Sequence, residues 1–222
     1  MNISSSPGTL NEGTAPETPH TATVLPRRFF GIVLAVLLLA VLFNFLLQRL
    51  RPHEFYGTRL QATTPVSDFQ LDTSAGHLMH LTDFRGKYVL LYFGYTFCPD
   101  ACPLTLNDLA DMMTALGDKA ANVQVIFVSI DPERDSVEQL VSYLPHFNPT
   151  FLGMTGDPDI IRGAATQFGI FYEKRGETVG YTMDHTSTVA VIDPDGYLAL
   201  LFPFGTSGEQ MASDLTYLGV AR

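Results

Sequence analysis

The stretch Tyr92-Phe-Gly-Tyr-Thr-Phe-Cys98-Pro-Asp-Ala-Cys102-Pro103 contains both cysteines of this 222-residue chain. An apolar run from Tyr88 to Phe93, typical of a buried strand, leads into it, and a helical pattern from Pro103 to Leu116 follows it. Proline suits the first turn of a helix, where its missing N–H costs nothing. We therefore predict that both sulfurs lie on a loop entering a helix N-terminus, where unpaired amides and the helix dipole favour thiolate over thiol.

The spacing of Cys98 and Cys102 predicts local chemistry, because two cysteines so close together cannot staple a large fold. They form either a redox pair that closes a Cys98–Cys102 disulfide or a metal site. A thioredoxin-type oxidoreductase usually has two residues between its cysteines, and this chain has three, so the sulfurs can converge on an ion as well as on each other. A pair of small buried hydrophobic residues is the remaining interpretation.

The charge of the chain excludes nucleic acid as the expected partner. The net charge is −10, and residues 1–51 carry four arginines against Glu12 and Glu17, a net +2. The rest of the chain therefore carries −12, which disfavours binding to phosphate backbones. A secreted domain that meets cations or basic protein surfaces fits this balance.

The N-terminal part predicts a membrane anchor. Residues 1–28 are rich in Ser, Thr, Pro and Gly and are expected to form a disordered cytoplasmic tail. Residues 29–48 form an apolar segment whose only polar member before Leu47 is Asn44, and nineteen residues span roughly 28 Å as a helix, close to a bilayer core. A cleaved signal peptide and a buried core helix are the alternatives, although no small-x-small cleavage site follows. Residues 49–64 are expected to be a linker.

The remainder, residues 65–222, has an α/β pattern: strand, helix, strand, helix, then a hairpin and a last helix. We predict a mixed central sheet flanked by helices. Val141 and Ile160 are assigned to the buried faces of the second and third helices. The other predicted elements are a hairpin within 66–81, strands at 123–130, 151–154, 188–192 and 197–202, and helices opened by Ser136, Asp157 and Ser207.

His185 is the candidate third ligand, although a lone histidine is more often an ordinary surface or core residue. It precedes the predicted strand from Thr188 to Ile192 by three residues. In thioredoxin-like folds the loop before this strand lies across from the cysteine loop, and aligning the strand puts Ser187 at the position of the usual cis-proline. Two thiolates and one imidazole suit Cu(I), whereas imidazole also serves Cu(II) and zinc.

Other candidates for a metal site are weaker. A second soft site at His77, Met79 and His80 is disfavoured because alternation along a strand separates the two histidines. Asp184 is expected to be a solvated neighbour of His185, with orienting His185 or completing a Cu(II) shell as the alternatives. Further residues are assigned structural roles: turn and cap for Asp131 and Asp135, core packing for Met112 and Met113, and helix association for Asn44.

The segments from Phe93 to Pro103, from Ser129 to Asp135, Asp184-His185 and Leu201-Phe-Pro-Phe-Gly205 together resemble the Sco/SenC family of copper-binding proteins. The match covers about Val66 to Leu218, with the same order of motifs. The resemblance implies a thioredoxin-like, membrane-anchored protein whose copper ligands are two cysteines and one histidine, here Cys98, Cys102 and His185. It also implies delivery of copper to the dinuclear copper centre of cytochrome c oxidase, or maintenance of that centre by keeping its cysteines reduced. The implied partner is the copper-centre subunit of the oxidase or another copper chaperone.

Two further functions use the same residues. A thiol–disulfide oxidoreductase acting on that centre or on other periplasmic proteins needs Cys98 to attack and Cys102 to resolve the mixed disulfide, and His185 is then dispensable. A peroxidase of the peroxiredoxin kind needs a proline that Tyr95-Thr-Phe-Cys98 lacks. We expect a single-pass protein of the bacterial inner membrane whose folded domain faces the periplasm, acting as a metallochaperone rather than as an enzyme in the strict sense.

Overall fold

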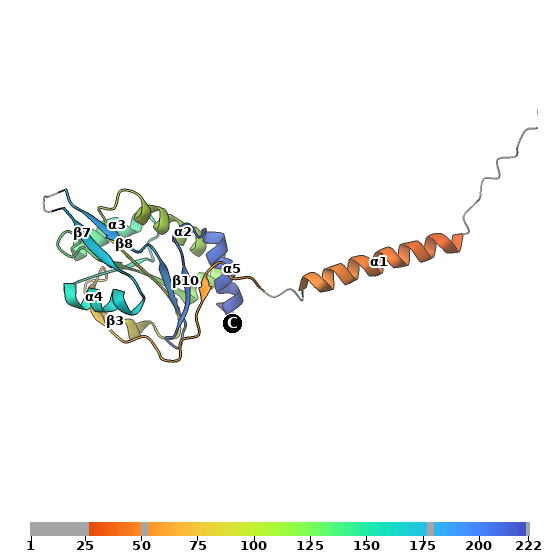
Figure 1. Cartoon of the computed structure of the whole chain (residues 1–222), viewed down its shortest axis with the longest axis horizontal. Coiled ribbons are helices and arrows are strands. Elements are labelled where there is room, and N and C mark those ends of the chain that lie inside the picture. Colours follow the sequence, from red (N-terminus) through yellow and green to blue (C-terminus); the bar gives the residue numbers. More distant parts are fainter. Residues whose placement is uncertain (1–26, 50–52, 177–179, 221–222) are drawn as a thin grey trace, which may run out of the picture. The chain divides into compact units, whose positions relative to one another are not determined.

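The computed structural model describes residues 27–49, 53–176 and 180–220 (Figure 1). Residues 1–26, most of the predicted cytoplasmic tail, lie outside the described residues, as do residues 50–52 of the predicted linker. The chain divides into two compact units, Met1–Pro52 and His53–Arg222, and each is considered by itself.

The first unit contains one helix, α1 (Arg27–Arg49), in its described part. Within it, the apolar window Phe30–Leu47 is long enough to cross a membrane, and none of its residues is buried. This exposed apolar surface favours a lipid environment over a position in a protein core. The predicted N-terminal apolar helix is therefore present.

The second unit is built on an eight-stranded mixed sheet with the order β1-β10-β9-β4-β5-β6-β2-β3. The central strand β4 pairs in parallel with β5 and antiparallel to β9, and all three are almost wholly buried. The strands are β1 (Thr58–Arg59), β2 (Gln70–Thr73), β3 (Leu78–His80), β4 (Tyr88–Gly94), β5 (Val123–Ser129), β6 (Leu152–Thr155), β9 (Val189–Ile192) and β10 (Leu198–Phe202).

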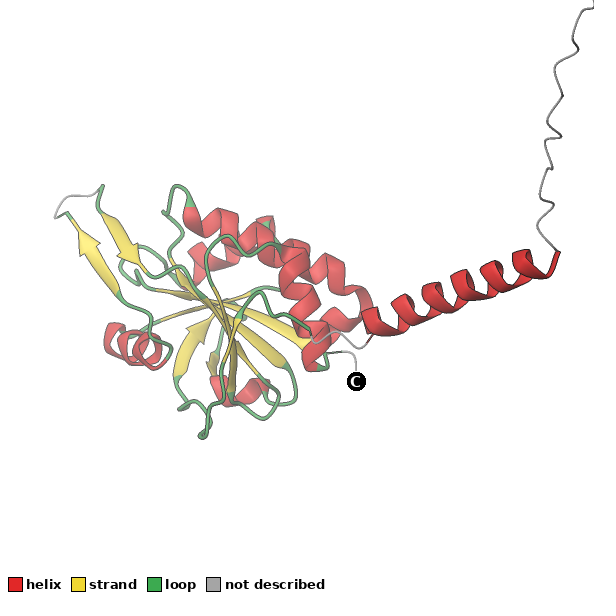
Figure 2. Ribbon diagram, turned by 45° about the vertical axis from the view of Figure 1, so that its right-hand side comes forward, coloured by secondary structure: helices red, strands yellow, loops and turns green. Residues whose placement is uncertain are grey.

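Helices cover both faces of this sheet, as Figure 2 shows. Side chains alternate along β4, so Tyr92 and Phe93 point to opposite faces of the sheet. On one face, the Tyr92 ring contacts Phe127, and Phe127 contacts Tyr143 of α3. On the other face, Phe93 contacts Phe168 at the end of α4. The helices are α2 (Ala101–Leu116), α3 (Val137–Tyr143), α4 (Pro158–Gln167) and α5 (Gly208–Leu218), with short 3-10 turns η1 (Leu81–Phe84), η2 (Gly117–Asn122) and η3 (Leu144–His146). The predicted α/β fold, a mixed sheet flanked by helices, is confirmed.

The pairing of strands brings three distant segments to one end of the sheet. Because β4 and β5 are parallel, the cysteine loop after Gly94 and the loop after Ser129 leave the sheet side by side. Strand β9 runs the opposite way, with Val189 opposite Tyr92, so the segment that precedes β9 arrives at the same end. That segment carries His185.

A two-stranded hairpin outside the main sheet was not predicted. Strands β7 (Tyr172–Arg175) and β8 (Thr182–His185) pair with each other alone, and Figure 1 shows them projecting from the body of the domain. Their sequences are charged and lack the apolar alternation by which a strand is recognised. His185 is thus the last residue of a strand rather than part of a plain loop.

Three smaller expectations differ from the structure. The predicted linker 49–64 contains β1, and the folded unit begins at His53, because the buried carboxylate of Asp214 binds the segment before β1. Val141 and Ile160 were wrongly assigned to the core, since both are exposed. The buried faces of their helices are centred on the neighbouring Leu140 and Ile161, about 100° further round the helix.

Candidate metal centre

The two cysteines flank the start of α2. Cys98 precedes the helix and is half-buried, whereas Cys102 lies in its first turn and is completely buried. The helix begins at Ala101, two residues earlier than predicted, so Pro103 occupies its first turn and only Cys98 lies on the entering loop. The backbone N–H of Cys102 donates to Cys98 Sγ over 3.4 Å, which places this sulfur at the positive end of the helix.

The pKa values of the two thiols are shifted in opposite directions. A hydrogen bond from the Cys102 thiol lowers the pKa of Cys98 to about 5, assisted by the backbone amides of Asp100 and Cys102 and opposed by partial burial. The same bond, together with burial, raises the pKa of Cys102. The copper-free dithiol therefore holds one thiolate at neutral pH, on Cys98, and one retained proton, on Cys102. The lowered pKa of Cys98 agrees with the predicted thiolate, whereas the pKa of Cys102 shifts in the opposite direction.

His185 points its metal-binding edge at the sulfurs. Its Nδ1 lies 3.2 Å from the carbonyl oxygen of Thr186, which can only accept a hydrogen bond, so Nδ1 carries the proton. Nε2 then carries the lone pair and lies 3.4 Å from Cys102 Sγ, within hydrogen-bonding distance of that sulfur. The rings of Tyr92 and Tyr95 meet the imidazole edge-on, with centroids 6.3 and 6.0 Å away, and limit its rotation.

Cys98, Cys102 and His185 thus form a group whose three ligand atoms all lie within 4.8 Å of one another. Two sulfurs and one imidazole nitrogen are soft donors, which favour Cu(I) over hard, oxygen-seeking cations, although zinc takes the same donors. Both free thiols and the oriented imidazole therefore lie close enough to converge on a single soft ion. The residues predicted from sequence are brought together in one place.

Gly94 makes room for the buried sulfur at the end of β4. A Cβ at this position would lie 3.0 Å from Cys102 Sγ and 2.9 Å from the Phe127 ring, so any side chain displaces one of them. Tyr92, two residues earlier on the same face, is completely buried. These contacts fix the position of Cys102 from the sheet side.

The other candidate metal ligands, His77, His80 and Asp184, hydrogen-bond to protein groups outside the cysteine–histidine site. The Nδ1 of His80 is 2.7 Å from a carboxylate oxygen of Asp68, and the Nδ1 of His77 faces the Ala75 carbonyl. The carboxylate of Asp184 accepts from Arg175 Nε over 2.7 Å, so this residue is engaged within the hairpin next to His185. Among the described histidines, cysteines and acids, the trio of Cys98, Cys102 and His185 is the group with metal-binding geometry.

Sequence reasoning underestimated Asp131 and Asp135, which were assigned to a turn and a cap. Both are buried, with exposed fractions of 3% and 0%. Asp135 accepts hydrogen bonds from the backbone and hydroxyl of Thr96, two residues before Cys98. The signal was available in the sequence, since Asp131 and Asp135 lie in the loop that follows a buried strand, at the sheet end where functional residues gather.

Comparisons with known proteins identify the family. The SCO1/SenC family model matches residues 57–218, which is most of the chain. The chain is 32% identical to the human mitochondrial SCO2 homolog over 172 residues, covering 76% of this chain and 65% of the human protein. The chain thus spans just under two thirds of the length of that relative.

Solved structures agree with this assignment. Apo Sco1 from Thermus thermophilus is 43% identical, with a TM-score of 0.68, covering 75% of this chain and 98% of that structure. ScoI from Bradyrhizobium japonicum, solved with copper bound, is 35% identical, with a TM-score of 0.64, covering 69% of this chain and 99% of that structure. On the matched sequence, the shared fold and the cysteine–histidine group, this chain belongs to the SCO1/SenC family.

Proposed function

We propose that this protein binds copper through Cys98, Cys102 and His185 and acts in the assembly of cytochrome c oxidase. The observation that carries the proposal is the convergence of these three soft ligand atoms within 4.8 Å. The copper-bound state of the Bradyrhizobium relative supports the choice of copper over zinc. The link to cytochrome c oxidase rests on the family resemblance.

Each ligand has a distinct part in binding. Cys98 is ionised already, since its pKa is about 5, and it is the half-exposed sulfur that an arriving Cu(I) meets first. Cys102 must lose its proton before it binds, and its burial then shields the bound ion from water. His185 offers Nε2 from the opposite side, on a segment that is partly exposed. This gives a three-coordinate site that suits Cu(I).

We further propose that the protein delivers copper to the dinuclear centre of cytochrome c oxidase, directly or through another copper chaperone. A three-coordinate ion can accept a ligand from a partner before it loses one of its own. The partly exposed ligands Cys98 and His185 are the two that an incoming partner reaches first. Ligand exchange therefore begins at their side, and Cys102 releases the ion last.

A copper titration of the full chain in detergent tests this function. Wild type is expected to bind one Cu(I), and Cys98→Ser and His185→Ala are each expected to lose affinity by at least about tenfold. Unchanged stoichiometry and affinity in both variants would contradict the proposal. His80→Ala is the matched control, because that ring pairs with Asp68 and is expected to leave binding unchanged.

A thiol–disulfide oxidoreductase is the second candidate, and the unequal thiols favour it. The Cys98 thiolate attacks an acceptor disulfide, one acceptor sulfur leaves as a thiolate, and a mixed disulfide forms. Cys102 then loses its proton and attacks Cys98 Sγ, which leaves a Cys98–Cys102 disulfide in this chain and a reduced dithiol in the acceptor. Two electrons pass to the acceptor, so reduction of such a disulfide with all copper chelated supports this role. The disulfide form cannot bind copper through these sulfurs.

We place α1 in the bacterial inner membrane as a single-pass anchor, with the folded domain in the periplasm. The apolar, unburied window Phe30–Leu47 supports the anchor. Alkaline phosphatase folds only outside the cytoplasm, so a fusion after Leu218 is expected to be active. An inactive fusion that is present at normal levels contradicts this topology.

A further inference from the structure

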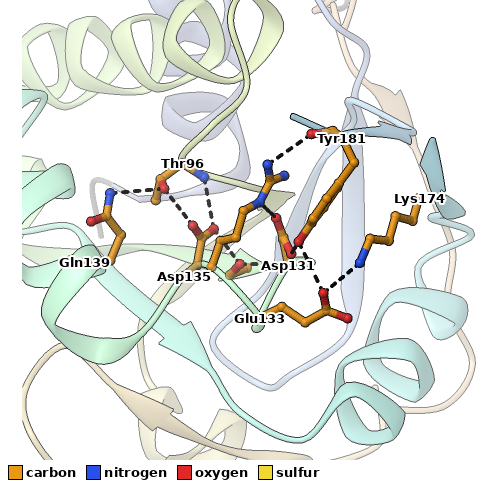
Figure 3. Close-up of polar contacts among 9 residues, drawn as sticks. Thr96, Asp131, Glu133, Asp135, Gln139, Lys174 and Tyr181 are labelled. Carbon is orange, nitrogen blue, oxygen red and sulfur yellow. Dashed lines mark hydrogen bonds and ion pairs between the residues drawn. The ribbon is translucent and has the colours of Figure 1, made fainter. Parts of the chain in front are cut away.

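The loop between β5 and α3 contacts both segments that carry the proposed ligands (Figure 3). At one end, the carboxylate of Asp135 accepts from the Thr96 N–H over 2.9 Å and from its hydroxyl over 2.6 Å. Ser129 donates to the same carboxylate over 2.6 Å, and Gln139 donates to the Thr96 hydroxyl over 3.2 Å. The cysteine loop is therefore tied to this loop two residues before Cys98.

At its other end, the same loop binds the hairpin that ends in His185. The Tyr181 hydroxyl donates to Asp131 over 2.6 Å, and Arg134 donates to that carboxylate through Nε. Arg134 also donates through a terminal nitrogen to the Tyr181 carbonyl over 3.0 Å, with its guanidinium carbon 3.6 Å from the centre of the Tyr181 ring. Figure 3 shows Tyr181 and Lys174 reaching toward the loop from the hairpin. Lys174 pairs with Glu133 over 2.6 Å.

Arg134 joins the two ends directly. Its guanidinium carbon lies 5.7 Å from the ring centre of Tyr95 and 4.9 Å from that of Phe97, both on the cysteine loop. Cation–π contacts of this kind are stabilising, and more so when the cation is removed from water. Arg134 is only 16% exposed, so these contacts are largely shielded from water. One guanidinium thus touches the cysteine side and the histidine side of the site.

The hairpin depends on such contacts for its position. Strands β7 and β8 pair with each other and with no strand of the main sheet among the described residues. A two-stranded hairpin is at best marginally stable by itself in water. Tyr181 lies four residues before His185, so movement of the hairpin at Tyr181 moves the imidazole relative to the sulfurs.

We propose that Asp131, Arg134 and Tyr181, here called the clasp, are positioning residues that hold His185 Nε2 at bonding range of the two sulfurs. This deepens the proposed copper function and rests on it. With the clasp closed, the site offers three ligands; with the clasp broken, the hairpin moves away and the ion keeps the two cysteines alone. The clasp therefore decides whether copper is held by three ligands or by two.

Two measurements on the full chain in detergent test the clasp. The first, without metal, is hydrogen exchange of the backbone amides of 182–186, with β9 as internal reference. The second is the Cu(II) complex, read by its thiolate-to-copper absorption and by nitrogen hyperfine splitting in its electron paramagnetic resonance spectrum. His185→Ala gives the reference spectrum for a lost imidazole.

Arg134→Gln is expected to raise exchange over 182–186 by about tenfold or more while β9 is unchanged. Its copper affinity is expected to fall by about tenfold, as for other groups that orient a metal ligand, and its spectrum to move toward that of His185→Ala. Arg175→Gln is the matched control: it also replaces an arginine by glutamine, but Arg175 lies in the hairpin itself, where its ion pairs among the described residues are with Glu173 and Asp184. It is expected to behave as wild type in both measurements.

A folded Arg134→Gln protein with wild-type exchange and a wild-type spectrum overturns the proposal. Where Arg134→Gln does not fold, Tyr181→Phe decides in its place, because it removes only the hydroxyl, which donates to Asp131 over 2.6 Å and to Glu133 over 3.5 Å. Raised exchange over 182–186 in that variant supports the clasp, and unchanged exchange overturns it. A wild-type protein that binds no copper contradicts the proposed function instead, and the metal-free exchange experiment still decides about the clasp.

Discussion

The Nε2 atom of His185 lies 3.4 Å from the Sγ atom of Cys102, although 83 residues separate them in the chain. Three strands produce this proximity. Strand β4 ends before the cysteines, the parallel β5 leads into the loop that carries Asp131 and Arg134, and the antiparallel β9 begins shortly after the histidine. The order of the strands in the sheet therefore brings the site together. His185, which adds an imidazole to the two thiols, comes from the separate β7–β8 hairpin.

Copper binding is expected to release about one proton per ion at pH 8. Cys98 is already a thiolate there, because the hydrogen bond from Cys102 lowers its pKa to about 5, while Cys102 still holds its proton because its pKa is raised. Affinity for Cu(I) then rises by about tenfold per pH unit around this pH, as one displaced proton requires. Calorimetry in buffers of different ionisation enthalpy measures the count. Release of two protons at pH 8 would show that Cys98 is not ionised.

Alkylation of the reduced, copper-free protein is expected to occur at Cys98 and to spare the buried Cys102. The thiolate is the nucleophile, so the rate is constant above the pKa and falls as the pH drops through about 5. Cys102→Ala removes the main donor to Cys98 Sγ and is expected to raise the midpoint of the profile. Iodoacetamide labelling followed by mass spectrometry measures both. A wild-type midpoint near that of a free cysteine, about 8.5, contradicts the assigned electrostatics.

Gly94→Ala is expected to weaken copper binding and to destabilise the fold by about 1–3 kcal/mol. The added methyl group would lie 3.0 Å from Cys102 Sγ and 2.9 Å from the Phe127 ring, and both neighbours are completely buried. Denaturant unfolding and a copper titration measure the two effects. Gly163→Ala is the control, because a Cβ there meets nothing within 4 Å and the position is helical. If Gly94→Ala and Gly163→Ala have the same stability and the same copper affinity, the assigned packing of Gly94 against Cys102 is wrong.

Asp214→Ala is expected to lower the free energy of unfolding of the folded unit by about 3 kcal/mol without changing copper stoichiometry. The buried carboxylate accepts from His53 Nε2 over 2.7 Å and from the N–H groups of Tyr56 and Gly57 over 2.9 Å each. Its loss leaves these donors without an acceptor and frees the segment before β1. Thermal unfolding checks this, with Ser213→Ala on the same helix as control. A variant as stable as that control contradicts the assignment.

The strands, helices and cysteine loop could be predicted because their signals are local. The apolar run of β4, the hairpin turn from Asp193 to Gly196, and the caps Asp157 and Ser207 each appear in the structure where the sequence indicates them. The cap at Ser136 is only half of the predicted capping box. Its hydroxyl accepts from the Gln139 N–H, but the Gln139 side chain donates to Thr96 of the cysteine loop instead.

The remaining features depend on tertiary contacts that leave no local pattern. Strand β8 has the polar sequence Thr-Met-Asp-His, and it is held as a strand by pairing with β7 and by Tyr181 against Arg134. Asp135 looks like a turn residue, and only the arrival of Thr96 beside it makes it an anchor of the cysteine loop. His185 was found by aligning the chain to a known fold, whereas its hairpin and its clasp required coordinates.

X-ray absorption at the copper edge of the Cu(I)-loaded full chain tests the central claim most directly. Two sulfurs and one nitrogen are expected around a single ion, with the nitrogen lost in His185→Ala and one sulfur lost in Cys98→Ser. A wild-type spectrum without sulfur, or one that is the same in all three proteins, would contradict the assignment of Cys98, Cys102 and His185 as the copper ligands.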